Sequence, residues 1–140
     1  MLYLDTSLLA SALTQEESTP AMQAWLAQQD AGSLAISDWV VTEFSSALAI
    51  KLRTRAMRAQ DRAAALATLT RLTADSLDLL PVSRQAFRTA ARFVDQPALN
   101  LRAGDALHLA ICAEAGATLC TRDQRLAAAA PQLGVPIAAL

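Results

Sequence analysis

The chain opens with Met1-Leu2-Tyr3-Leu4-Asp5-Thr6-Ser7, a short apolar run that ends at an aspartate followed by two hydroxyl residues. An apolar run of this length, bounded by polar residues, is typical of a buried strand. Because Thr6 or Ser7 can cap a helix, we expect a helix to follow and to run through Ala12. The opening therefore predicts a strand that leads directly into a helix, with Asp5 at the junction.

The alternation of short strands and helices continues along the chain. Further strands are expected at 34–36, 76–81, 118–121 and, less regularly, 135–139. Helices are expected from Ser18 to near Gly32 and at 38–52, 60–74, 83–95, 105–115 and 124–130, with a loop at 97–104. Short strands that alternate with helices predict parallel pairing and an α/β sandwich. In such sheets, functional sites form beyond the carboxyl ends of the strands.

Length and composition indicate one domain that spans residues 1–140. The net charge of −1 excludes a global basic field, so any nucleic-acid binding needs a local patch. Cys112 and Cys120 match no zinc-site spacing and are expected to be buried, reduced side chains. With neither a signal peptide nor a long apolar segment in view, we expect a cytosolic protein that does not enter a membrane.

Four acidic residues occupy positions where apolar or small neutral side chains are usual: Asp5, Glu43, Asp105 and Asp123. Each has an ordinary alternative explanation. Asp5 fits a turn, Asp105 a helix cap and Asp123 a helix start, whereas Glu43 fits a glutamate that reaches solvent or pairs with an arginine. Glu43 has mostly apolar or small helical neighbours, which favours a packed face. All four fall at strand ends or on inward helix faces, and this joint pattern predicts one site.

Carboxylates without Cys or His partners suit Mg²⁺ or Mn²⁺ rather than zinc. Such ions orient and deprotonate a water for attack on a phosphodiester. The nearby hydroxyls of Thr6, Ser7 and Thr121 are candidates to hold metal-bound water or phosphate oxygens. The pattern therefore predicts a metal-dependent nuclease.

Two other features remain open from the residues alone. His108 lies three positions after Asp105, which fits either a second metal ligand or a packed, hydrogen-bonded histidine. The segment 51–62 is basic and fits RNA phosphates, an acidic partner or a solvated helix junction. Arg102 and Arg122 flank the proposed acids and are candidates to bind phosphate or to offset carboxylate charge.

Four segments of the chain resemble the motifs of PIN domains, in the same order and with matching separation. They are Tyr3-Leu4-Asp5-Thr6-Ser7, Thr42-Glu43-Phe44-Ser45-Ser46-Ala47-Leu48, Ala103-Gly104-Asp105-Ala106-Leu107-His108-Leu109-Ala110 and Thr121-Arg122-Asp123. The compact length is similar to that of VapC toxins of type II toxin–antitoxin pairs. The resemblance implies a Rossmann-like, three-layer sandwich around a parallel sheet of about five short strands.

The resemblance also implies a Mg²⁺- or Mn²⁺-dependent endoribonuclease that forms a homodimer and is inhibited by a VapB-like antitoxin. It makes Asp5, Glu43 and Asp105 the main metal-binding and catalytic acids, with Asp123 in the fourth and most variable acidic position. The basic residues expected to contact RNA or the antitoxin are Arg53, Arg55, Arg102 and Arg122. Related chains often carry a glycine in the turn after the Glu43 helix, whereas Lys51–Arg58 has none.

Two other classes of protein share parts of this pattern. A receiver-like signalling domain also binds Mg²⁺ through acids, but it needs a lysine after a late strand, and Lys51 follows a helix. A non-catalytic module would keep the fold without the activity, which the four filled acidic positions disfavour. A DNA-directed nuclease stays open, because nothing in the sequence indicates recognition of a 2′-hydroxyl.

Overall fold

The computed structural model describes residues 1–30 and 32–140. Its strands are β1 (Leu2–Leu4), β2 (Leu34–Ser37), β3 (Asp78–Leu80) and β4 (Thr118–Cys120). Its helices are α1 (Thr6–Leu13), α2 (Thr19–Ala27), α3 (Asp38–Arg53), α4 (Ala59–Asp75), α5 (Arg84–Val94), α6 (Ala103–Ala115) and α7 (Gln124–Ala129). Short 3₁₀ turns cover Pro97–Leu99 and Pro131–Leu133.

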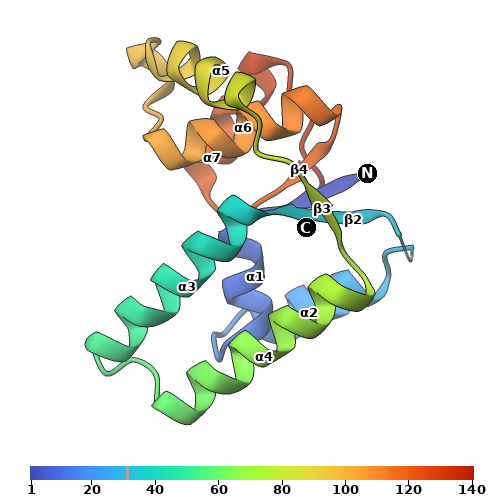
Figure 1. The fold of residues 1–140 in the computed structure, drawn as a ribbon, viewed down its shortest axis with the longest axis vertical. Coiled ribbons are helices and arrows are strands. Elements are labelled where there is room, and N and C mark those ends of the chain that lie inside the picture. Colours follow the sequence, from blue (N-terminus) through green and yellow to red (C-terminus); the bar gives the residue numbers. More distant parts are fainter. Residues whose placement is uncertain (31) are drawn as a thin grey trace.

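The described residues form a four-stranded parallel sheet in the order β3-β2-β1-β4. Helices α1–α4 lie on one side of the sheet and α5–α7 on the other, which makes three layers (Figure 1). The predicted α/β class and parallel sheet are confirmed. The segment expected as a fifth strand contributes only one parallel bridge, between Leu119 and Ile137, with hydrogen bonds on either side of it.

The strand order places a topological switch point between β1 and β4. From β1 the chain adds β2 and then β3 on one side, and it returns across the sheet to add β4 on the other side of β1. Ligands of open α/β sheets bind outside the carboxyl ends of the strands at such a point. Asp5 directly follows β1, and Thr121 directly follows β4.

Several element boundaries differ from the sequence prediction. The cap of α1 is Asp5 rather than Thr6 or Ser7, because the Asp5 carboxylate accepts from the Leu8 backbone N–H. Helix α6 begins at Ala103 rather than Asp105. Helix α2 ends at Ala27, short of Gly32, and Ala31 lies outside the described residues.

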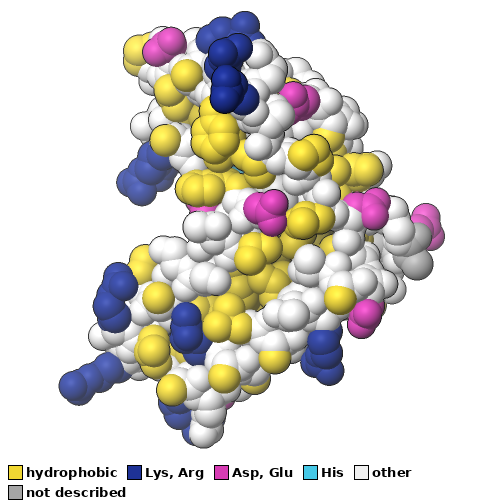
Figure 2. All heavy atoms as spheres, viewed as in Figure 1, with side chains coloured by type: hydrophobic (Ala, Val, Ile, Leu, Met, Phe, Trp, Pro, Cys, Tyr) yellow, Lys and Arg dark blue, Asp and Glu magenta, His cyan; other side chains and the backbone are white. Residues whose placement is uncertain are grey.

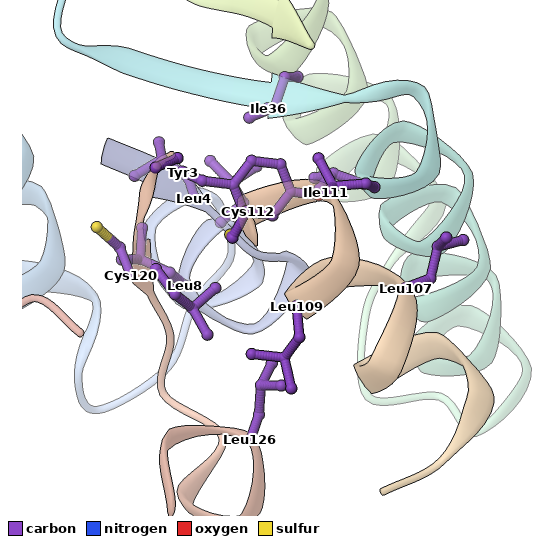
Figure 3. Close-up of a cluster of buried hydrophobic side chains, with 14 of the residues drawn as sticks. Tyr3, Leu4, Leu8, Ile36, Leu107, Leu109, Ile111, Cys112, Cys120 and Leu126 are labelled. Carbon is purple, nitrogen blue, oxygen red and sulfur yellow. The ribbon is translucent and has the colours of Figure 1, made fainter. Parts of the chain in front are cut away.

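The core lies on both faces of the sheet and is built mainly from aliphatic side chains. Tyr3, Phe44 and Leu109 are among its largest fully buried members. Figure 3 shows Leu109 of α6 against Leu126 of α7. Asp105 lies in α6, and Asp123 immediately precedes α7. Within residues 1–30 and 32–140, no helix combines the length and apolar character that crossing a bilayer requires.

Cys112 and Cys120 are buried free thiols, as predicted. Burial is the main cause that raises the pKa of Cys112, and it raises the pKa of Cys120 to about 12. Both thiols therefore stay protonated at neutral pH, which argues against a thiolate nucleophile.

The turn after α3 forms without a glycine. Arg55 has φ +60°, and the N–H groups of Arg55 and Ala56 donate to the carbonyls of Leu52 and Lys51. This is the Schellman pattern, in which glycine is usual at the left-handed position. A non-glycine residue in that conformation costs about 1–2 kcal/mol.

We expect Arg55→Gly to raise the free energy of unfolding by about 1 kcal/mol, because it removes most of this backbone strain. Arg53→Gly is the matched control, since it removes the same charge from the end of α3. That control should lower stability by about 0.5–1 kcal/mol. Urea unfolding of both variants measures the effect, and equal losses in the two would contradict it.

Candidate active site

All four acids predicted from the sequence line one pocket of about 350 Å³. In a parallel α/β sheet, strands end and helices begin at the same edge, and the acids follow that rule. Asp5 caps α1, Asp123 caps α7, Asp105 lies in the first turn of α6 and Glu43 lies in the second turn of α3. On the side where β2 runs into α3, the surface is hollowed between α3 and the helices of the opposite layer (Figures 1 and 2).

Asp5 is the most deeply buried of the four, with 3% of its surface exposed. Its carboxylate accepts hydrogen bonds from the Leu8 N–H at 2.9 Å, from Ser7 Oγ at 2.8 Å and from Thr121 Oγ1 at 2.5 Å. Burial raises the pKa of Asp5, although these hydrogen bonds oppose the rise. The carboxylate is therefore held in place by neutral donors while its charge stays poorly solvated.

Glu43 is half-buried and is held through one of its two oxygens. Oε2 accepts from Thr6 Oγ1 at 2.8 Å and contacts His108 Nε2 at 2.6 Å. Burial acts to raise the pKa of Glu43, but the hydrogen bond and charge of His108 and the hydrogen bond from Thr6 hold the pKa below its usual value. The predicted packed face is only partly observed, because Ser46 and Ile50 are exposed.

Asp123 caps its helix as its ordinary explanation describes, whereas Asp105 lies inside the first turn of α6 instead of capping it, and both also face the pocket. Asp123 Oδ1 accepts from the backbone N–H groups of Arg125 and Leu126 and so caps α7. Asp105 Oδ2 accepts from the Arg102 backbone N–H at 3.2 Å. Each carboxylate keeps one oxygen without a hydrogen bond among the described residues.

The pocket is acidic and lacks a compensating basic side chain. Among residues 1–30 and 32–140, no lysine or arginine lies within 4.0 Å of any of the four carboxylates, and Glu43 is hydrogen-bonded to His108 instead. Gathered carboxylates without a positive partner are costly, which favours a bound cation. The donor set is all oxygen and so fits Mg²⁺ or Mn²⁺.

The four carboxylates are too far apart to form a complete coordination shell around one ion. In the described part of the chain, no three His, Cys, Asp or Glu side chains are grouped closely enough to hold one ion. Mg²⁺ commonly keeps several waters and takes only one or two carboxylates directly, so a wide acidic pocket still suits it. Glu43 Oε1 also lies 2.8 Å from the position that a Cβ on Gly104 would occupy, which leaves this carboxylate room only because residue 104 is glycine.

The predicted supporting hydroxyls contact the acids, whereas among the described residues the charged side chains of the predicted basic residues do not. Thr6 holds Glu43, and Ser7 and Thr121 hold Asp5. The four predicted basic residues are all exposed: Arg53, Arg55, Arg102 and Arg122. Arg53 is ten residues beyond Glu43 on α3, about 15 Å along the helix axis. The Arg122 guanidinium hydrogen-bonds the hydroxyls of Ser11 and Ser18.

The sequence pattern did not assign three residues that shape the site: Tyr3, Gly104 and His108. His108 is the packed, hydrogen-bonded histidine that was one of its two interpretations. Its contact with Glu43 joins residues 65 apart, so no local spacing indicates it. The signal available was weak: the only histidine in the chain lies within an apolar helix beside a proposed ligand.

We expect Thr121→Val to destabilise the protein by about 1–2 kcal/mol and to reduce activity. The substitution keeps the side-chain shape but removes the Oγ1 that donates to Asp5 and accepts from the Asp123 N–H. Thr118→Val, on the same segment, is the control and should change stability by less than about 0.5 kcal/mol. Urea unfolding compares them, and a neutral Thr121→Val would show that Asp5 does not depend on this donor.

A family model for the PIN domain matches residues 2–131, so the chain belongs to the PIN domain family. No curated protein sequence matches it. VapC20 of Mycobacterium tuberculosis, described as a sarcin-ricin loop cleaving toxin, is 18% identical over 92% of this chain and 95% of that chain, with a TM-score of 0.75.

Two further solved structures share the fold. FitAcB from Neisseria gonorrhoeae is 18% identical over 98% of this chain and 96% of that chain, with a TM-score of 0.69. VapBC2 from Rickettsia felis, bound to a DNA fragment from its promoter, is 17% identical over 99% of this chain and 98% of that chain, also with a TM-score of 0.69. At these identities the comparisons establish the fold.

Proposed function

We propose that this chain is a Mg²⁺- or Mn²⁺-dependent endoribonuclease and the toxin of a toxin–antitoxin pair. One observation carries the proposal: four carboxylates without a lysine or arginine partner among the described residues line a single pocket at the switch point of the sheet. Asp5, Glu43 and Asp105 would hold the cation directly or through its bound waters, and Asp123 would support it or its water. A divalent cation bound there would lower the pKa of a coordinated water and offset charge on the phosphate.

The residues around the acids have defined tasks in this proposal. Ser7 and Thr121 orient Asp5, and Thr6 orients Glu43. Arg102 and Arg122 are exposed and lie close in sequence to Asp105 and Asp123, and they would attract the RNA backbone toward the pocket. Arg53 and Arg55, at the far end of α3, would contact a more distant part of the RNA or the antitoxin.

The proposed partners follow from the relatives. VapBC and FitAB complexes share the fold, which supports a VapB-like antitoxin as partner, and VapC20 supports RNA as substrate. We also propose a homodimer. Exposed apolar side chains such as Phe87 and Leu79 are available for contacts between chains.

The test is cleavage of a defined RNA pool by antitoxin-free protein with Mn²⁺, with EDTA, and with Mn²⁺ restored after EDTA. Ends mapped by sequencing identify the target, and a single-stranded DNA pool tests the choice of nucleic acid. Asp5→Asn purified in parallel excludes contaminating nucleases. Cuts that require the metal and are lost in the variant are expected. No cleavage of any pool by folded protein would favour a non-catalytic binding module.

A further inference from the structure

Tyr3 and His108 form a buried polar contact directly behind the acidic pocket. Tyr3 is fully buried and His108 is 3% exposed, and their ring centroids are 5.8 Å apart. Tyr3 belongs to β1 at the centre of the sheet and lies among core side chains (Figure 3). A phenol and an imidazole buried this deeply need hydrogen-bond partners, because unpaired polar groups are costly there.

Those partners form one continuous series that ends at Glu43. Ser37 Oγ lies 2.7 Å from Tyr3 Oη, and Tyr3 Oη lies 3.0 Å from His108 Nδ1. His108 Nε2 lies 2.6 Å from Glu43 Oε2. The series joins β2, β1, α6 and α3, so every step links a different element.

The direction of the last hydrogen bond follows from the chemistry of Glu43. An ionised carboxylate only accepts hydrogen bonds, so His108 Nε2 must carry a proton and donate it. When the imidazole is neutral, its Nδ1 is then an acceptor, and Tyr3 donates to it. Tyr3 Oη in turn accepts from Ser37. The histidine is thereby fixed in one ring orientation and one tautomer.

The series leaves the two Glu43 oxygens unequal. Oε2 takes donors from both His108 and Thr6, whereas Oε1 is directed at Gly104, next to Asp105. We propose that Ser37, Tyr3 and His108 are positioning residues that hold the Glu43 carboxylate with Oε1 available to a divalent cation. This inference rests on the proposed function, because it assigns a task in metal binding at the same pocket.

A positioning role has a physical basis in the length of the glutamate side chain. A free glutamate loses much rotamer entropy on ligating an ion, and a carboxylate fixed beforehand loses less. Outer partners of metal ligands are typically worth about 10–100-fold in affinity or activity. The Tyr3 hydroxyl acts one step further away and is expected to contribute less than the imidazole.

The first test measures Mn²⁺ binding by calorimetric titration of antitoxin-free wild type, His108→Leu, His108→Gln and Tyr3→Phe. We expect the dissociation constant to rise about 10–100-fold in His108→Leu. A smaller rise of about 3–10-fold is expected in Tyr3→Phe, which keeps the ring and the fold. His108→Gln should recover part of the loss, because the glutamine amide N–H can replace Nε2–H toward Glu43.

Ser83→Ala is the control for lost stability. The substitution removes the Ser83 hydroxyl, which caps α5 by accepting from the Ala86 N–H and also donates to Glu114. Ser83 does not line the acidic pocket. The substitution should lower the melting temperature without changing the dissociation constant for Mn²⁺. Equal Mn²⁺ affinity in wild type, Tyr3→Phe and His108→Leu would overturn the inference.

A second readout needs no metal and no activity. His108 is the only histidine in the chain, so its ring nitrogens can be assigned without ambiguity in ¹⁵N NMR spectra. We expect a proton on Nε2 in the metal-free protein, and a changed Nδ1 resonance in Tyr3→Phe. A ring without a proton on Nε2 would overturn the inference.

If wild type neither binds Mn²⁺ nor cleaves RNA, the proposed function fails as well. If wild type does both and the variants bind Mn²⁺ equally well, the inference alone fails.

Discussion

Asp5→Asn should lower RNA cleavage by about 10³-fold or more and leave the protein folded. Loss of a charged ligand removes metal-based charge stabilisation worth several kcal/mol, and each 1.36 kcal/mol corresponds to a tenfold change in rate. Asparagine keeps the oxygen that accepts from the Leu8 N–H and is itself a favoured helix cap. The local structure therefore has no reason to change.

In the absence of metal, the same variant should be more stable than wild type at neutral pH. Burial raises the pKa of Asp5, so the folded state binds its proton more tightly than the unfolded chain does. The stability linked to this proton is fully present below the ordinary carboxyl pKa. It is lost as the pH rises through the folded-state pKa. The asparagine of the variant cannot titrate, so we expect a higher free energy of unfolding than that of the wild type at pH 7–8.

Mn²⁺ should reverse this order of stability. An ion present at 100 times its dissociation constant stabilises the wild type by about 2.7 kcal/mol and has little effect on Asp5→Asn. Thermal unfolding with EDTA and with Mn²⁺ measures both effects. Asp61→Asn is the control, because it removes an acid that pairs with Arg58 outside the acidic pocket. Full cleavage by Asp5→Asn, or a large loss of stability without metal, would show that Asp5 is only a helix cap.

Gly104→Ala should reduce cleavage and Mn²⁺ binding by about 10²-fold with little change in overall stability. An alanine Cβ would lie 2.8 Å from Glu43 Oε1 and 3.4 Å from Trp39 Cζ2. The glutamate cannot move aside without losing the hydrogen bonds at its other oxygen. Displacement of a reacting or ligating group by about 1 Å costs on the order of 10²-fold. The higher helix propensity of alanine, about 0.8–1 kcal/mol, offsets part of the strain.

Gly116→Ala is the matched control and should show the opposite pattern. A Cβ at Gly116 meets nothing within 4 Å, but the residue has φ +62°. Alanine there should cost about 1–2 kcal/mol of stability and leave cleavage unchanged. RNA cleavage, Mn²⁺ titration and urea unfolding of both variants separate the two effects. If Gly104→Ala cleaves RNA and binds Mn²⁺ as wild type does, Glu43 does not need the position seen here.

Much of the fold follows from neighbouring residues and could therefore be predicted. Apolar runs at 2–4, 34–36 and 118–120 set the strands, and Ser83 caps α5 through its own side chain. The sequence prediction was wrong mainly at the ends of helices, where two neighbouring residues can each serve as the cap. Asp5 rather than Thr6 caps α1, because its carboxylate reaches the Leu8 N–H while the Thr6 hydroxyl donates to Glu43.

The four acids were also predictable as candidates, because each interrupts an apolar pattern; their role as ligands stays a prediction. Only the tertiary structure decided how they meet. The strand order β3-β2-β1-β4 sets β1 beside β4 and so joins Asp5 to Thr121, 116 residues away. The contacts of His108 with Glu43 and Tyr3 span 65 and 105 residues. Helix and strand propensity and hydrophobic periodicity act over a few neighbouring residues. These contacts instead depend on how whole helices and strands pack against one another, and no local sequence pattern indicates that packing.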